Sequence, residues 1–363
     1  MINDFESKNR GVAISFSDIS LVPQNSDVSG RELVDLATTV AGFHLSHPIM
    51  PTNMSTITGL DMMNHLSFTN GIAFCHRFMS ELELEAIIHS HLSYREDNGF
   101  CNIPTAFSIG VKKEDHDWIK HSISIMPESI TKNMVVLIDI AHGDSKYVLD
   151  TVKIVKDYMP NSIKIIGGNV ATGEGFARLV NAGVDGVRVG ISGGSVCTTK
   201  YVTGHGVPTL ASVMDCAKTR DALGVHEISI IADGGITNSG DIVKSLAFGA
   251  DAVCIGRLLS GSSLTPGNII EVDGKKYKEY YGMSSHIAQD RHKGGLRRGI
   301  AAEGIDVLVP YAGDTEKILS KLIGGVQSGL AYSGAYSIQE LRENFEYVTL
   351  GAGGISNKNN NWN

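Results

Sequence analysis

The segment ISIIADGGITNSGDIVKSLAFGADAVCIG, residues 228–256, decides the fold because it has the pattern of a strand, a helix and a second strand. The apolar run Ile228–Asp233 ends at two glycines, the amphipathic stretch Ser239–Phe248 follows, and the apolar run Ala252–Gly256 completes the unit. Continuous apolar runs are typical of parallel strands that are buried on both faces. The stretch between them is long enough for a crossover helix. The segment therefore predicts two parallel strands of one sheet.

The same pattern recurs along the chain. Further short apolar runs occur at Pro48–Met54, Gly71–Cys75, Ala106–Gly110, Val135–Ile140, Ile163–Gly168 and Gly186–Gly190. Amphipathic stretches at Glu174–Ala182 and Leu210–Leu223 have the length of crossover helices. A doubly wound sheet could share this alternation. The number of strands and the small or polar residues beyond their ends favour a closed (β/α)₈ TIM barrel.

We expect one catalytic domain, because no internal repeat or linker marks a second. This domain should cover residues 1–350 and include a long active-site flap at about 260–304, a segment rich in Gly, Ser and charged residues. The polar tail 351–363 is expected to be disordered.

Composition and charge narrow the possible functions. The chain has 363 residues, of which 42% are hydrophobic and 19% charged, as in ordinary globular proteins. A net charge of −8 gives no attraction for nucleic acid or an anionic membrane, which favours a small phosphorylated ligand. Five cysteines without close spacing favour a reducing compartment, and the sequence has neither a signal peptide nor a membrane-spanning apolar run. We therefore expect a cytoplasmic protein that binds neither nucleic acid nor membranes.

The loop VGISGGSVCTTKYVTGHGVP, residues 189–208, carries a candidate nucleophile, Cys197. Its glycines would allow the backbone N–H groups of Gly194 and Ser195 to surround an anion. A free thiol is only about 3% thiolate at neutral pH, but it is intrinsically a strong nucleophile. The remaining cysteines lie inside or beside apolar runs, where small buried side chains are expected; they are Cys75, Cys101, Cys216 and Cys254.

The thirteen histidines show no pattern typical of a metal site. The closest pair, His89 and His91, lies on a charged stretch that we expect to be solvated. No catalytic metal is therefore predicted. His205 follows the Cys197 loop closely and could tune the thiol, although a solvent-facing loop histidine is the stronger expectation.

Several motifs together resemble the IMP dehydrogenase/GMP reductase family. The resemblance covers nearly the whole chain in order and spacing, and each motif alone would be weak. The motifs are FSDISLVP at 16–23, GGNVATGE at 167–174, GGSVCTTK at 193–200, ADGGITNSGDIVKSLAFGADAVCIG at 232–256, YYGMSS at 280–285, AAEG at 301–304 and LIGGVQSGLAYSGA at 322–335.

The resemblance implies a purine nucleotide ligand. Its 5′-phosphate would be held by Ser195, Gly235 and Gly256, and Asp233 would accept hydrogen bonds from the ribose hydroxyls. Arg257 is not a typical residue at its position, and it could add a phosphate contact or be a surface charge.

Met283 and Ser284 would contact the purine ring. The family also implies a homo-oligomer, with a tetramer as the expectation.

Within the family, two features favour a reductase. Only about 30 residues separate Cys75 from Ala106, which leaves no room for the regulatory insertion common in dehydrogenases. The dehydrogenase flap carries an Arg-Tyr pair that activates water, whereas this chain has Arg291 followed by His292. Without a water-activating pair, reduction fits the chemistry better than hydrolysis.

The resemblance to reductases implies that Cys197 attacks C2 of GMP, while Thr199 and Glu303 relay a proton to the departing ammonia. Hydride from NADPH would then give IMP. Asp139 and Arg77 would lie on the nicotinamide side, although reductases commonly have Lys at the position of Arg77 and Arg does not donate a proton at neutral pH.

Other features keep two alternatives open. AHGD at 141–144 and GAGGI near the carboxyl terminus are closer to the dehydrogenase pattern, so an IMP dehydrogenase that forms XMP with NAD remains an alternative. Ser192 and Gly193 give SGG where the family usually has GPG, which argues against a monovalent-cation site at the loop carbonyls. A catalytically inactive nucleotide-binding protein on the same fold is a third possibility.

Overall fold

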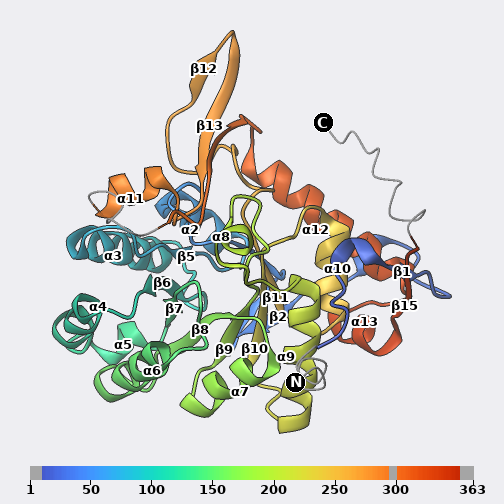
Figure 1. Ribbon diagram of the computed structural model, residues 1–363, viewed down its shortest axis with the longest axis horizontal. Helices are drawn as coiled ribbons and strands as arrows, with labels where there is room; N and C mark the ends of the chain where they lie inside the picture. The colour runs from blue at the N-terminus through green and yellow to red at the C-terminus, as the bar shows by residue number, and fades with distance from the viewer. Residues whose placement is uncertain (1–9, 294–300, 352–363) are drawn as a thin grey trace, which may run out of the picture.

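A computed structural model describes residues 10–293 and 301–351, and a parallel sheet of eight strands forms its centre. The strands lie in the order β4-β11-β10-β9-β8-β7-β6-β5, so the sheet nearly closes into a barrel (Figure 1). Their bounds are β4 Ile49–Pro51, β5 Phe74–Cys75, β6 Thr105–Ile109, β7 Met134–Asp139, β8 Lys164–Val170, β9 Gly186–Val189, β10 Ser229–Asp233 and β11 Ala252–Ile255. All eight predicted strands and the predicted (β/α)₈ barrel are confirmed.

Helices connect the strands and surround the barrel (Figure 1). The α-helices are α2 Leu60–Phe68, α3 Glu81–Asp97, α4 Lys113–Trp118, α5 Glu128–Thr131, α6 Lys146–Tyr158, α7 Gly173–Ala182, α8 Thr199–Thr203, α9 Thr209–Leu223, α10 Ser239–Ala247, α11 His286–Lys293, α12 Thr315–Tyr332 and α13 Ile338–Asn344. The short helices are η1 Phe16–Asp18, η2 Arg31–Leu33 and the π-helical turn η3 Ile119–Ile123. Within the described ranges, none of these helices is long and apolar enough to cross a membrane.

Local sequence explains where the predicted helices begin and end. The side chain of Thr172 accepts a hydrogen bond from Gly175 N at the start of α7, and Asn238 accepts one from Asp241 N at the start of α10. Such residues satisfy backbone N–H groups that the first helical turn leaves without partners. Helix α7 ends at Gly183, whose φ of 92° is left-handed, a conformation that favours Gly.

Apolar side chains inside the barrel close its amino-terminal end. Met50, Leu137 and Ile231 point into the barrel and join Val40 and Leu45 in one buried cluster. The last two belong to a hairpin of β2 (Thr38–Val40) and β3 (Phe43–Leu45). This hairpin is fixed by bonds from Thr38 Oγ1 to Asp251 O and from Ala41 N to Ser229 Oγ, both at the amino ends of barrel strands. A ligand must therefore enter at the carboxyl ends.

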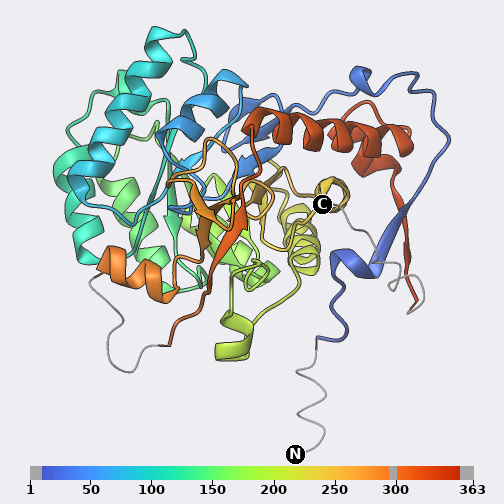
Figure 2. The same ribbon diagram turned by 90° about the horizontal axis from the view of Figure 1, so that it is seen from above.

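Additional strands extend from the barrel. The segment after β11 forms an antiparallel sheet of β12 (Ile270–Val272), β13 (Lys275–Tyr281) and β14 (Asp306–Pro310), and the β12–β13 hairpin projects outward (Figure 1). The predicted flap thus contains a hairpin and α11, while 294–300 lie outside the described residues. Strand β1 (Ile19–Val22) pairs antiparallel with β15 (Glu346–Thr349), which places a segment near the amino terminus beside one near the carboxyl terminus (Figure 2). The predicted tail, from 352 on, also lies outside the described residues.

Two expectations about single residues are wrong. His91 is 2% exposed, because it lies on the inner face of α3 and contacts Ser67 Oγ and Thr105 Oγ1 at 2.9 Å each. Burial lowers the pKa of His91 to about 4. Cys101 is exposed in the turn after α3 rather than buried, whereas the other three cysteines expected to be buried are buried.

Asp251 connects several elements at the closed end of the barrel. Its Oδ2 accepts hydrogen bonds from Arg220 Nη1 at 2.8 Å and from Ile230 N at 2.7 Å, and its Oδ1 accepts one from Arg342 Nη2 at 2.8 Å. The side chains of Asp251 and Arg220 are 15% and 8% exposed. This carboxylate therefore joins α9, β10 and α13.

Replacing Asp251 should destabilise the fold. Asp251→Ala leaves two arginines without their carboxylate, and losing one partner of a buried ion pair costs on the order of 3 kcal/mol. The change is measured as a fall in melting temperature followed by circular dichroism. Lys113→Ala is the control, because it removes only an exposed pair with Asp117 and should leave the melting temperature nearly unchanged. Equal melting temperatures for the two variants would contradict the assignment.

Candidate active site

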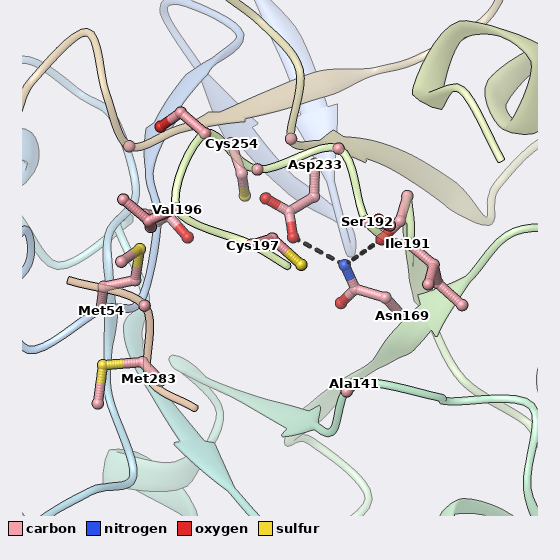
Figure 3. Close-up of a pocket in the computed structure, with 18 of the residues that line it drawn as sticks. Met54, Ala141, Asn169, Ile191, Ser192, Val196, Cys197, Asp233, Cys254 and Met283 are labelled. Atoms are coloured by element: carbon pink, nitrogen blue, oxygen red, sulfur yellow. Dashed lines mark hydrogen bonds between the residues drawn. The ribbon is translucent and has the colours of Figure 1, made fainter. Parts of the chain in front are cut away.

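A pocket of about 340 Å³ opens at the carboxyl ends of the barrel strands. Its wall consists of residues near or after the carboxyl ends of β4, β5, β7, β8, β9, β10 and β11, together with Tyr280, 282–284 and Glu303. In Figure 3, Cys197, Asp233 and Asn169 project into it from one side, and Met54 and Met283 from the other. This volume and the mixed polar and apolar lining suit a small organic ligand.

The Cys197 loop turns sharply after β9. Gly190 has a φ of 136°, and a Cβ atom at this position would lie 2.0 Å from the carbonyl oxygen of Asp233. Only glycine allows both the conformation and the approach. The loop consequently lies against the ADGG turn after β10, and both segments line one pocket.

Cys197, Thr199 and Glu303 form a continuous line of contacts at the pocket wall. Cys197 Sγ lies 3.2 Å from Thr199 Oγ1, which donates a 2.8 Å hydrogen bond to Glu303 Oε2. The backbone supports this arrangement, because Thr198 N donates to Glu303 O and Cys197 pairs with Gly304 in an antiparallel bridge. A thiol can attack an electrophilic carbon here while a hydroxyl and a carboxyl group transfer a proton beside it.

One end of the pocket can hold an anion. Gly194, Gly235 and Gly256 line the pocket together with Ser195, whose hydroxyl lies 3.4 Å from Tyr280 Oη. Burial raises the pKa of Tyr280, so its hydroxyl remains a hydrogen-bond donor at neutral pH. Arg257 is exposed and lines the same pocket. Hydroxyls, backbone donors and a guanidinium are typical of phosphate sites.

Asp233 presents a carboxylate to the middle of the pocket. Its Oδ2 accepts a hydrogen bond from Asn169 Nδ2 at 2.7 Å, and the same Nδ2 donates to Gly190 O at 2.7 Å (Figure 3). Arg188 Nε lies 3.2 Å from the same oxygen. In the described chain Oδ1 has no hydrogen-bond partner, so it is available to accept from a ligand hydroxyl.

Asp139 and Arg77 lie together on the other side of the pocket. Arg77 Nε donates to Asp139 O at 2.9 Å and lies 3.5 Å from Asp139 Oδ2, and the guanidinium stacks on Phe78 at 4.4 Å. Both residues line the pocket at the ends of β7 and β5. Asp139 and Arg77, which the sequence analysis assigns to the nicotinamide side, therefore lie in contact with each other.

Met283 and Ser284 also line the pocket. Ser55 N and Oγ lie 3.4 and 3.5 Å from Met283 Sδ, and Ser55 Oγ lies 3.2 Å from Tyr281 Oη. These contacts fix the Met283 side chain. A methionine held in this way offers an apolar surface for a flat ring.

The structure thus brings every predicted site residue to one pocket and adds four that sequence reasoning missed: Asn53, Asn169, Arg188 and Tyr280. Tyr280 is the first residue of the quoted motif YYGMSS, which was the available signal for it. Asn169 lies inside the quoted motif GGNVATGE and its side chain contacts are visible only in three dimensions.

His205 is exposed, and its Nδ1 lies 2.8 Å from Thr203 O. It does not line the pocket. Residues 10–293 and 301–351 contain no group of three or more His, Cys, Asp or Glu side chains placed to hold a metal ion.

Comparison with known proteins identifies relatives over nearly the full length. The family model described as "IMP dehydrogenase / GMP reductase domain" matches residues 13–360. Inosine-5′-monophosphate dehydrogenase of Nitrosopumilus maritimus is 39% identical over 464 aligned positions, covering 94% of this chain and 97% of that protein.

Two reductases are similar to a comparable degree. GMP reductase of Onchocerca volvulus is 33% identical, with 93% of this chain and 91% of that protein covered. GMP reductase of Shewanella pealeana is 34% identical, with 93% and 94% covered. The family model spans far more than half of the chain. The chain therefore belongs to the IMP dehydrogenase/GMP reductase family.

Proposed function

We propose that this protein is a GMP reductase, which converts GMP to IMP and ammonia with NADPH. The line of contacts from Cys197 Sγ through Thr199 Oγ1 to Glu303 Oε2 carries the proposal. It places a nucleophile and a proton relay in the pocket that also holds the anion-binding groups and the Asp233 carboxylate. Family membership supplies the class of substrate, a purine nucleotide, and the class of cofactor, a nicotinamide dinucleotide.

The residues opposite Cys197 fit a nicotinamide cofactor. The nicotinamide nucleoside of such a cofactor carries a carboxamide on its ring and a diol on its ribose, and these groups need hydrogen-bond donors and acceptors at one place. Arg77 offers donors and the Asp139 carboxylate offers acceptors there. When bound, the cofactor would supply a hydride to C2 of the purine.

The side chains then have distinct roles in the reaction. Ser195, Gly235, Gly256 and Arg257 bind the 5′-phosphate, and Asp233 accepts hydrogen bonds from the ribose hydroxyls. Met283 and Ser284 orient the purine. A bond forms between Cys197 Sγ and C2 of GMP, and the bond from C2 to the amino nitrogen breaks as Thr199 and Glu303 deliver a proton to the leaving ammonia. Hydride addition at C2 then breaks the bond to sulfur and releases IMP.

The position of Arg291 supports reduction over hydrolysis. Its Nη1 and Nη2 donate to the two oxygens of Glu279 at 2.8 and 3.0 Å. The guanidinium also stacks on Tyr281 at 5.5 Å, and within the described chain it does not line the pocket. An arginine held in this way is poorly placed to activate water at Cys197. The side chain of His292 lies outside what the structure describes.

Alignment lengths also support the reductase. The two GMP reductases align over 351 and 347 positions, close to the length of this chain. The dehydrogenase alignment of 464 positions exceeds the 363 residues of this chain, so that relative contains residues that this chain lacks. The connection from β5 to β6 consists mainly of α3, as expected for a chain without a regulatory insertion.

IMP dehydrogenase is the second candidate. The 39% identity to the Nitrosopumilus protein exceeds the identity to either reductase quoted above, and the AHGD motif at 141–144 points the same way. A protein that only binds nucleotides would have no need for the Cys197, Thr199 and Glu303 contacts.

Substrate pairs separate these candidates directly. The purified protein should oxidise NADPH in the presence of GMP, seen as a loss of absorbance by the reduced cofactor, with equal release of IMP and ammonia. IMP with NAD should give little reduced cofactor. Robust IMP oxidation without GMP turnover would replace the reductase with a dehydrogenase, and nucleotide binding without either reaction would support an inactive binding protein.

Cys197 should be essential for chemistry but not for binding. Cys197→Ala should lower kcat by about 10⁴-fold or more, while the Kd for GMP changes only slightly, because no second thiol lies in the loop. Turnover and calorimetric binding are measured in parallel. Cys101→Ser is the control, since Cys101 is exposed and does not line the pocket, and it should keep full activity. Appreciable turnover by Cys197→Ala would rule out covalent catalysis at this thiol.

Glu303 should act in ammonia release. Glu303→Gln keeps the size of the side chain but cannot hold the transferable proton, so kcat should fall about 100-fold with the KM for GMP nearly unchanged. Ammonia is measured chemically for both proteins. Glu271→Gln, on the exposed strand β12, is the control. If Glu303→Gln releases ammonia as fast as the wild type, Glu303 has no part in the relay and only anchors the flap.

A further inference from the structure

Arg188 lies at the floor of the pocket, and the proposed reaction steps do not involve it. It lies on β9 and its side chain is 10% exposed, surrounded by barrel strands. Sequence reasoning passed over it because it stands in the short apolar run GVRVG, residues 186–190. A charged side chain inside a barrel costs free energy unless it is paired and fully hydrogen-bonded.

The guanidinium of Arg188 donates in several directions at once. Nη2 donates to Asp139 Oδ1 at 2.8 Å, and Nη1 donates to Asn53 Oδ1 at 2.5 Å. Nε donates to Asn169 Oδ1 at 2.6 Å and lies 3.2 Å from Asp233 Oδ2. Asn53 is held in turn, since its Nδ2 donates to Ser108 Oγ. The planar group thus contacts side chains from four different strands or strand ends.

Charge balance explains why Arg188 remains ionised. Burial alone would lower the pKa of the guanidinium, but the Asp233 and Asp139 carboxylates outweigh burial and raise the pKa above its usual value. The same positive charge allows two carboxylates to point into one small pocket. Without it they would repel each other across a medium of low dielectric constant.

We propose that Arg188 is a positioning residue that fixes Asp233 on the nucleotide side and Asp139 on the cofactor side at the same time. The naming of the two sides rests on the proposed function. Because one guanidinium orients both carboxylates, nucleotide and cofactor affinity depend on the same residue. Lysine cannot replace it, since a single ammonium lacks the planar arrangement of donors that reaches Asp139, Asn53 and Asn169 together.

Arg220 provides a matched control. Its side chain is 8% exposed and its Nη1 donates to Asp251 at 2.8 Å, so it is also a buried arginine paired with an aspartate. It lies at the closed end of the barrel and does not line the pocket. A loss of stability alone should therefore appear equally in variants of either arginine.

The test compares Arg188→Lys, Arg188→Ala and Arg220→Lys in the full-length protein. Calorimetry gives the Kd for GMP and for NADPH separately, and melting temperature reports stability. Both Arg188 variants should weaken both ligands by about tenfold or more, the loss expected when a charge-assisted contact disappears. Arg220→Lys should lower the melting temperature and leave both Kd values unchanged. If Arg188→Ala does not fold, Arg188→Lys decides.

The Kd for GMP of a double variant separates a positioning role from a purely structural one. Arg188→Ala combined with Asp233→Ala should bind GMP no more weakly than Asp233→Ala alone, because both changes act through one carboxylate. Additive losses, or a loss for only one of the two ligands, would overturn the proposal. These measurements need no turnover, so they remain decisive even if the reaction proves to be IMP oxidation, in which case IMP and NAD replace GMP and NADPH.

Discussion

The pocket depends on the close approach of two backbone segments that have glycine at the points of contact. A Cβ on Gly193 would lie 2.5 Å from Thr209 Oγ1 and 3.0 Å from the carbonyl carbon of Gly234, and a Cβ on Gly234 would lie 2.9 Å from Gly194 N. The loop after β9 can therefore touch the turn after β10 only if these positions are glycine. The contact brings the thiol of Cys197 to the same pocket as Asp233, although different strands carry them.

This contact also explains how residues that are remote in sequence come to lie close together. Once the loop lies against the turn, Val196 and Thr198 form backbone hydrogen bonds with 303–305, and Glu303 N donates to Ser284 O. The backbone of the Cys197 loop thereby aligns the segment that carries Glu303. The contacts that join Cys197, Thr199 and Glu303 are thus a consequence of strand-like pairing rather than of any local motif.

Sequence reasoning could find the barrel because each strand is a short, continuous apolar run, and burial on both faces leaves few other interpretations. It found Cys197 because a thiol in a polar glycine loop has no packing role. It missed Arg188 because one charged residue in an apolar run shows nothing of its partners, which come from other strands. The expectation for His91 is wrong for a related reason: a helix with many charged residues still has an inner face, and the sequence alone does not show which residues lie on it.

Two buried clusters of Arg and Asp lie at opposite ends of the barrel, and the partners of their carboxylate oxygens distinguish them. Both oxygens of Asp251 accept hydrogen bonds from the protein, so this carboxylate stabilises the fold. Asp233 receives its protein contacts at Oδ2, and in the described chain Oδ1 has none. An arginine stabilises the charge of this carboxylate through Oδ2, and Oδ1 can accept a hydrogen bond from a ligand. The same chemistry therefore holds the barrel together at one end and prepares it for binding at the other.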